Sequence, residues 1–305
     1  MWLSLAFLSA AMLGFYDVFK KYSLRNNAVL PVLFLNTLFC ALQFVPVFIL
    51  SGMGITDNSH PLYIAPWVWD EQLFILAKAV IVLSSWIFGY FTIKHLPITI
   101  VGPVNATRPV LTLTGAMLVF GESLNLWQWA GVTLAIVSFY LLSKSGKKEG
   151  IRFAHNRWIY FLVAAALIGA CSGLYDKFLM APAESGGIAL HRLTVQAWHN
   201  IYQCGIMAII LLVLWLPRRS STTPFRWTWA IPMISIFITF ADFVYFQALS
   251  EPEAMVSIVS MVRRGSVIVS FCFGAMIFHE KNLRAKAFDL LLVAIGLFCL
   301  WMGGQ

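Results

Sequence analysis

Long runs of apolar residues, interrupted by short polar segments, dominate this chain of 305 residues. Each run is about 20 residues long, which is the length that an α-helix needs to cross the hydrocarbon core of a bilayer. The pattern therefore predicts an all-α membrane protein with ten transmembrane helices. Their predicted bounds are Trp2–Tyr22, Val29–Leu50, Gln72–Ile93, Pro97–Phe120, Leu124–Leu142, Arg157–Leu179, His191–Leu216, Trp227–Leu249, Pro252–Phe278 and Leu283–Met302.

The segments between the runs support this interpretation. Lys94–Leu96 and Ser250–Glu251 are so short that the spans they join must be antiparallel neighbours. Pro97 and Pro252 are predicted to be the first residues of spans four and nine, where a missing N–H does no harm. The first run lacks a basic leading segment and a small-residue cleavage site, so we expect a membrane span and not a signal peptide.

The two halves of the chain resemble each other in order and spacing. Four features recur at offsets between 155 and 164 residues: Gly14–Phe19 as Gly173–Phe178, Asn36 and Cys40 as Asn200 and Cys204, Tyr90–Phe91 as Tyr245–Phe246, and Gly115–Met117 with Glu122 as Gly274–Met276 with Glu280. This predicts a first repeat over residues 1–143, a basic linker loop over 144–156 and a second repeat over 157–305. Five spans per half is an odd number, so the halves must insert with opposite orientations, as an inverted repeat.

Composition and charge agree with a membrane protein and predict its orientation. The chain is 60% hydrophobic and 11% charged, whereas soluble domains carry about 25% charged residues. Of its 21 Lys and Arg, fifteen follow odd-numbered spans, two lie on the opposite side and four lie within spans. The positive-inside rule then predicts a protein of the inner or plasma membrane with both termini outside the cytoplasm. Because the basic residues are spread over short loops, nucleic acid is not an expected partner.

Enzyme chemistry has no recognisable motif in this chain. The five cysteines all fall within predicted spans, without Cys-x-x-Cys spacing, so we expect free thiols and neither disulfides nor a metal site. Phosphate-binding glycine loops, nucleophile elbows and His-Glu-x-x-His are also missing from the sequence. We therefore predict no enzymatic activity and no cofactor. A long polar domain that would hold an ATPase is missing as well, so any transport is expected to be secondary.

The ends of spans four and nine carry a family resemblance. The segments from Gly115 to Leu124 and from Gly274 to Leu283 each place an acidic residue, Glu122 or Glu280, just before a short hydrophobic helix that closes the half. With the ten-helix inverted repeat, this pattern resembles the EamA-type branch of the drug/metabolite transporter superfamily. The resemblance covers essentially the whole chain. It implies a membrane transporter with a central cavity.

Charged residues within the spans are the main candidates for a site. Arg108 lies about midway along span four, and Arg263 and Arg264 lie about midway along span nine. Each costs on the order of 2.5–3.5 kcal/mol at a helix centre, so each requires a compensating partner. The repeat symmetry would bring them towards the centre, where a guanidinium suits a carboxylate or phosphate. The alternative is that they pair with buried acids and hold the helices in register.

The acids within the spans have two interpretations as well. Asp17 and Asp176 are repeat mates that each follow a tyrosine, and Asp242 lies in span eight. They would carry a proton, or they would form ion pairs with nearby lysines or arginines. Lys78 would belong to a site, or it would extend its side chain towards the membrane interface.

Aromatic and amide side chains complete the predicted site. The family resemblance implies that spans three and eight line the cavity, where Trp86, Tyr90 and Tyr245 would contact substrate. Asn105, one turn before Arg108, adds a polar group at the same depth. Interhelical hydrogen bonding explains such amides equally well.

The sequence thus favours a secondary transporter that moves a small polar metabolite by alternating access. The preferred substrate is an organic anion or zwitterion, such as an amino acid or a phosphorylated metabolite. One alternative is a proton-coupled exporter of cationic or drug-like compounds, and another is a non-transporting, lipid-handling membrane component. The expected partners are the lipid bilayer and the small-molecule substrate. A fused repeat favours a functional monomer and leaves oligomerisation open.

Overall fold

The computed structural model describes residues 2–56, 60, 62–108, 110–111, 125–147, 155–180, 187–250, 262–263, 265–278 and 283–303. All regular secondary structure within these residues is helical. The α-helices are α1 (Trp2–Ser23), α2 (Val29–Gly52), α3 (Trp69–His95), α4 (Ile98–Ala106), α6 (Leu126–Lys147), α7 (Arg157–Met180), α8 (Arg192–Ile210), α9 (Ala230–Ser250), α11 (Ser266–Phe278) and α12 (Leu283–Met302). Helix α8 is followed directly by a π-helical segment, η3 (Leu211–Trp215), and a 3-10 segment, η4 (Leu216–Arg218).

Most described helices begin and end within a few residues of the predicted spans. Helix α6 is an exception, because it continues to Lys147 instead of ending at Leu142. Backbone hydrogen bonding carries a helix past its last apolar residue, so the hydropathy pattern underestimated its length. Pro97 was also misassigned, since it is the N-cap of α4 and not its first residue. Pro252, most of the second half of predicted span four and most of the first half of predicted span nine lie outside the described residues.

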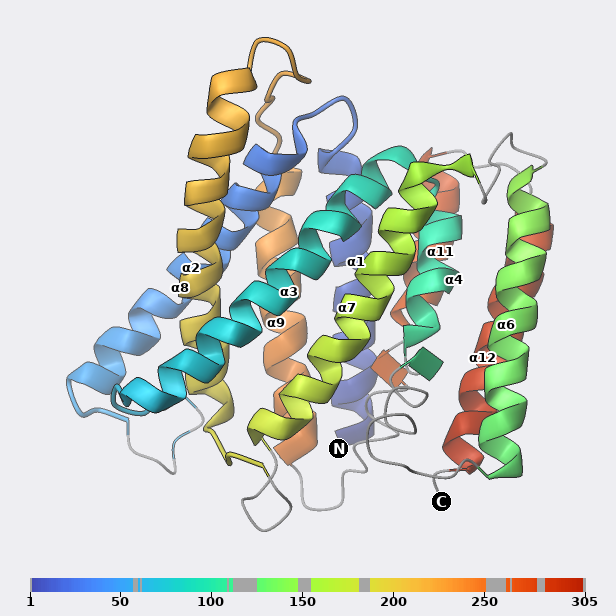
Figure 1. Ribbon diagram of the computed structural model, residues 1–305. Helices are drawn as coiled ribbons and strands as arrows, with labels where there is room; N and C mark the ends of the chain where they lie inside the picture. The colour runs from blue at the N-terminus through green and yellow to red at the C-terminus, as the bar shows by residue number, and fades with distance from the viewer. Residues whose placement is uncertain are drawn as a thin grey trace.

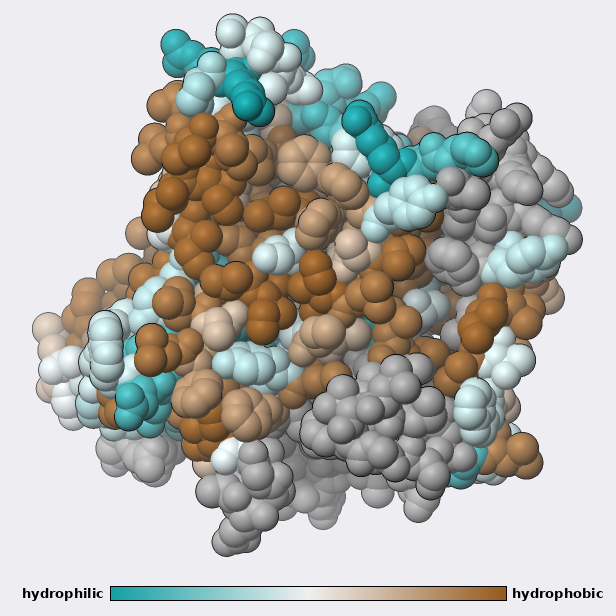
Figure 2. All heavy atoms as spheres, viewed as in Figure 1, coloured by the Kyte–Doolittle hydropathy of each residue, from teal (hydrophilic) through white to brown (hydrophobic). Residues whose placement is uncertain are grey.

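The length and hydropathy of several helices suit a membrane. Within the described part of the chain, four helical stretches are long and apolar enough to cross one: Val29–Gly52, Trp69–His95, Arg157–Asp176 and Arg192–Arg218. Shorter apolar helices cover Leu126–Ser138, Ala230–Tyr245 and Ser266–Phe278. Apolar residues cover most of the described surface seen in Figure 2, while hydrophilic residues gather at its upper end. An apolar surface of this extent requires lipid, so the chain is a multi-pass integral membrane protein.

The helices pack mainly as pairs from distant parts of the chain. Helix α1 packs on α9 and α11, and α3 packs on α7 and α8. Helix α2 packs on α8 and α9, α4 packs on α11, and α6 packs on α12. The marked chain ends lie at the same end of the helices, opposite the α8–α9 connection (Figure 1). This arrangement brings residues from both halves of the sequence into one interior.

Glycines allow the closest helix contacts. A Cβ atom added at Gly14 of α1 would lie 2.5 Å from Val269 Cβ and 2.9 Å from the Ser266 carbonyl oxygen of α11. A Cβ atom at Gly274 of α11 would overlap the side chain of Ile98 in α4. Small residues are common where membrane helices approach closely, because van der Waals packing holds such helices together. Gly14 and Gly274 therefore position α11 against its two neighbours.

Hydrogen bonds join α1 to the end of α3. The Lys21 ammonium group donates to the carbonyl oxygens of Ile93 and Leu96, at 2.6 Å each. The last carbonyls of a helix have no partner within it and carry the negative end of its dipole. Lys21 therefore stabilises the C-terminus of α3 electrostatically and ties α1 to α3 near one end of the helices.

Candidate functional site

A buried cluster of charged and aromatic side chains joins α1 to α3. Lys20 forms an ion pair with Asp17 at 2.7 Å, one turn earlier on the same helix. The Lys20 ammonium nitrogen also lies 4.2 Å from the ring centroid of Tyr16 and 5.4 Å from that of Tyr90. Both rings are almost fully buried, so these cation–π contacts are shielded from solvent. The predicted site residues Asp17 and Tyr90 thus share one cluster.

Arg108 lies near the same cluster. Its guanidinium lies against α7 at Gly169, where an added Cβ would be 2.8 Å from Arg108 Cζ and Nη1. The charge of Arg108 is close enough to Asp17 and Tyr16 to interact with both. Asn105, on the preceding turn, has a buried Oδ1 atom that accepts no hydrogen bond. The absence of a side chain at Gly169 therefore makes room for Arg108.

Arg263 is held in a second cluster, on α9. Its Nη2 donates to Asp242 Oδ1 in an ion pair. The guanidinium carbon lies 4.2 Å from the ring centroid of Tyr245, less than one turn after Asp242. An acid and an aromatic ring on one helix face therefore orient this arginine. Arg264, predicted as a further candidate, lies outside the described residues.

Lys78 forms an ion pair with Asp176 that joins α3 to α7. The Lys78 side chain is only 7% exposed, so its charge lies inside the protein beside this acid. Lys78 is also near enough to His199 of α8 for their charges to interact. The repeat mates Asp17 and Asp176 consequently have different partners, because one binds within its own helix and the other across helices.

Trp86 lies among apolar side chains. It packs, partly buried, against the cluster that contains Tyr90, Cys40 and Met207. All five cysteines of the chain are free thiols. Within the residues that the structure describes, no group of three or more His, Cys, Asp and Glu could hold a metal ion.

Cys40 of α2 stands between these clusters. Its Sγ lies 3.8 Å from Asn36 Oδ1. Asp242 of α9 and Cys204 of α8 are near enough to the Cys40 thiol to interact with it electrostatically. The Tyr90 side chain of α3 is near enough to interact with Cys40 as well. Cys40 therefore marks the region of the interior where four helices from both halves of the sequence meet.

Two glutamines of α8 belong to this interior and were missed by the sequence prediction. Gln196 and Gln203 are buried, and neither side-chain amide makes a hydrogen bond. Their spacing was a usable signal, because Gln196, Asn200 and Gln203 follow one face of a helix in an otherwise apolar span.

The chain resembles known proteins in both sequence and fold. Residues 1–144 match the model of the EamA-like transporter family. The predicted acids of the closing motif, Glu122 and Glu280, lie outside the described residues. No curated protein matches the chain in sequence. A solved structure titled "Crystal structure of protein" is similar with a TM-score of 0.59 and 15% sequence identity, over 99% of this chain and 98% of that one.

At that identity the solved structure supports the fold alone, over nearly the whole chain. The family match is independent of it and lies in the first half of the sequence. The apolar, all-helical architecture of the described residues agrees with both. Residues 1–144 of the chain therefore match the EamA-like transporter family, a part of the drug/metabolite transporter superfamily of membrane transporters.

Proposed function

We propose that the protein is a secondary transporter that moves a small organic anion or zwitterion, an amino acid or a phosphorylated metabolite, by alternating access. The observation that carries this proposal is the Arg263 cluster. A guanidinium is oriented there by Asp242 and Tyr245 among apolar helices. Charged groups at membrane depth are costly, and they commonly mark a substrate pathway.

The chemistry of Arg263 suits an anionic substrate. A guanidinium has five N–H donors in a planar fork, and the ion pair with Asp242 uses Nη2. A carboxylate or phosphate would engage the fork through two parallel hydrogen bonds. Asp242 would balance the charge of Arg263 when no substrate is bound. When the substrate binds, Asp242 would give up some of the guanidinium N–H groups to it. The Tyr245 ring limits the orientations of the guanidinium.

Arg108 and the Lys20 cluster would form the opposing part of the site. Arg108 interacts electrostatically with Asp17, which is paired with Lys20. Among the described residues, this group brings two cations, Arg108 and Lys20, close to one carboxylate. We therefore infer a second attraction for anionic groups, with Tyr90 contributing its ring beside Lys20.

Helix packing supports an inverted repeat as the basis of alternating access. In such a repeat α1, α2, α3, α4 and α6 correspond to α7, α8, α9, α11 and α12. The pair of α1 with α9 then corresponds to the pair of α7 with α3, and the helices of both pairs pack on each other. The other three matched pairs, α2 with α8, α4 with α11 and α6 with α12, pack on each other. We infer ten spans in two halves of opposite orientation, which suits rocking about a central site.

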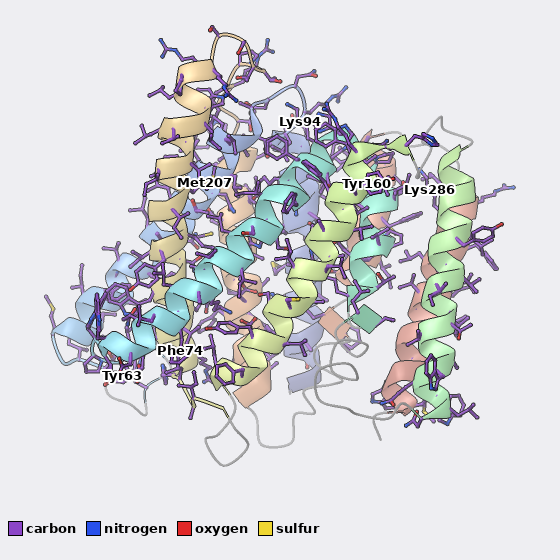
Figure 3. The ribbon with its side chains drawn as sticks, in the orientation of Figure 1. Tyr63, Phe74, Lys94, Tyr160, Met207 and Lys286 are labelled. Carbon is purple, nitrogen blue, oxygen red and sulfur yellow. The ribbon has the colours of Figure 1, made fainter. Side chains whose placement is uncertain are left out.

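The ends of the helices support the proposed orientation. Lys94, at the end of α3, and the basic residues of the α8–α9 connection lie at the end opposite the chain termini (Figures 1 and 3). By the positive-inside rule this end faces the cytoplasm, so both termini lie outside it. We propose the inner or plasma membrane, with a monomer as the functional unit.

The ion pairs weigh against cation transport by the three aspartates that the sequence singled out. An exporter of cationic compounds would need an aspartate that is available to the substrate or to a proton. Asp17, Asp176 and Asp242 are each already paired with Lys20, Lys78 and Arg263, respectively. The EamA-like match favours transport over catalysis and over a purely structural role in lipid.

Uptake by proteoliposomes tests the proposal. Purified protein would be reconstituted and supplied with labelled amino acids and sugar phosphates, with and without counter-substrate inside. We expect Arg263→Ala to abolish uptake of the transported compound and Arg263→Lys to retain only part of it, because an ammonium cannot form the bidentate contact. Arg25→Ala, which removes an exposed arginine near the end of α1, is the charge-matched control and should transport normally. Unchanged uptake by Arg263→Ala would exclude the proposed site.

A further inference from the structure

Helix α8 carries a row of polar side chains on its buried face. Gln196, Asn200, Gln203 and Met207 are separated by four, three and four residues, so they lie along one face of the helix. All four are buried, and Gln203 has no exposed surface. Ile209, on the opposite face, is 63% exposed and would contact lipid. The row therefore faces the protein interior, with Met207 at its end near the α8–α9 connection (Figure 3).

The two glutamines in this row make no hydrogen bond at either side-chain atom. Both Nε2 and Oε1 of Gln196 and of Gln203 are buried without a partner. Asn200 differs, because its Nδ2 donates to the Gln196 carbonyl oxygen at 2.9 Å. A buried amide without partners destabilises a fold, and native proteins rarely keep one without a reason. Two such amides on one helix face indicate that a hydrogen-bonding partner enters from outside the chain.

The direction of the row follows from the packing of α8. Helix α8 packs on α2 and α3. Val195 and Tyr202 lie on its α3 side, where the Tyr202 hydroxyl donates to Gln72 at 2.8 Å. Ala197 lies on its α2 side, in one hydrophobic cluster with Phe44. The glutamines project between these two contact faces, towards the centre of the helical assembly.

The row lies close to the proposed anion site. Gln203 is followed by Cys204, which is near enough to Cys40 of α2 to interact with it electrostatically. Cys40 interacts in the same way with Asp242, the ion-pair partner of Arg263. Asn36, one turn before Cys40, has a buried Nδ2 that makes no hydrogen bond. Amides with unused donors and acceptors therefore border the charged cluster.

We propose that Gln203 and Gln196, with Asn36, form a subsite for a neutral hydrogen-bonding group, a carboxamide or hydroxyl, on the transported anion or zwitterion. This proposal rests on the transport function proposed above and adds the substrate class. Arg263 would bind the acidic group, and the amides would bind the remainder of the molecule. A carboxamide side chain offers a donor and an acceptor side by side, which matches another amide or a vicinal diol. Substrates with apolar remainders would leave the amides unpaired and be rejected.

Two pairs of probes separate the neutral group from the charged one. L-glutamine and L-methionine have similar size and the same zwitterionic head, but only glutamine has a carboxamide. Glycerol 3-phosphate and n-propyl phosphate form the corresponding pair with a phosphate head. In wild-type proteoliposomes we expect the hydrogen-bonding member of one pair to be preferred by at least about tenfold, since a site built for a polar group rejects an analogue that lacks it.

Gln203→Leu should remove this preference by lowering uptake of the polar probe while leaving the apolar probe unchanged or improved. Gln128→Leu makes the same substitution on α6, which packs on α12, and should keep the preference. A preference that survives Gln203→Leu while Arg263→Ala abolishes uptake overturns the subsite and leaves the transport function standing. A preference that Gln203→Leu removes while Arg263→Ala has no effect supports the subsite and overturns the proposed anion site.

Cysteine labelling decides the case in which none of the four probes is transported. In a cysteine-free background, Gln203→Cys should react with a small water-soluble methanethiosulfonate from one side of the membrane, because a solute pathway must hydrate the row. Ile209→Cys, on the exposed face, should not react. Lack of reaction at Gln203→Cys from both sides would overturn the proposal whatever the substrate is.

Discussion

Replacing Gly14 by alanine tests how closely α1 and α11 approach. The added Cβ would lie 2.5 Å from Val269 Cβ and 2.9 Å from the Ser266 carbonyl oxygen. Carbon atoms pack best at about 3.5–4.0 Å, so the two helices must separate by about 1 Å. Overpacking of this kind costs about 1–3 kcal/mol. Alanine's higher helix propensity offsets about 1 kcal/mol of that cost.

The sequence repeat supplies a matched control for this substitution. Gly173 occupies the corresponding position in the second half, yet an added Cβ there would meet no atom within 4 Å. Gly173→Ala should therefore gain only the propensity term of about 1 kcal/mol. The two variants should differ in their free energy of unfolding by about 1–3 kcal/mol, with Gly14→Ala the less stable.

Reversible unfolding in mixed detergent micelles measures that difference directly. Both variants introduce the same methyl group into a transmembrane helix, so any general effect of alanine cancels. Equal stability of Gly14→Ala and Gly173→Ala would refute the close contact between α1 and α11. It would also remove one constraint on α11, which begins three residues after Arg263.

Two further predictions follow from the ion pairs and from the charge distribution. Asp176→Leu should lower the free energy of unfolding by about 3 kcal/mol, because it leaves the buried Lys78 charge without its partner. Lys78→Met should lower it less, because the Asp176 side chain that remains is 38% exposed. The double variant should recover most of the loss in the same unfolding assay, and a purely additive loss would argue against pairing. For the orientation, an impermeant thiol reagent applied to intact cells should label His60→Cys and spare Ser220→Cys in a cysteine-free background. The reverse labelling would place the termini in the cytoplasm.

Hydropathy predicted the described helices well because lipid imposes a simple rule. Every backbone polar group must be satisfied within the helix, and about 20 apolar residues are needed to cross. The bound at Leu142 was wrong because polar residues extend α6 to Lys147 without interrupting its hydrogen bonds. Gly14 and Gly173 occupy equivalent positions in the predicted repeat, so the sequence did not indicate that, of the two, only Gly14 packs closely against another helix.

The site was only partly predictable, since partners depend on how helices pack. Arg263 and Asp242 were both identified from their charge, but the sequence left their pairing open. The pair of Lys78 with Asp176 joins residues 98 positions apart and requires α3 to pack on α7, which no local pattern specifies. Gln203 was not predicted, because placing a neutral amide in a membrane span costs far less free energy than placing an arginine there, and such a residue does not by itself indicate a site.

Removing both members of the Arg263–Asp242 pair tests the central claim most directly. Arg263→Met alone strands a carboxylate among apolar helices, so it should lower stability and abolish uptake. Asp242→Leu combined with Arg263→Met removes both charges. If Arg263 binds the substrate, this double variant should regain thermal stability in detergent while proteoliposome uptake stays abolished. A double variant that regains both stability and full uptake would show that the pair is structural, and would contradict the account.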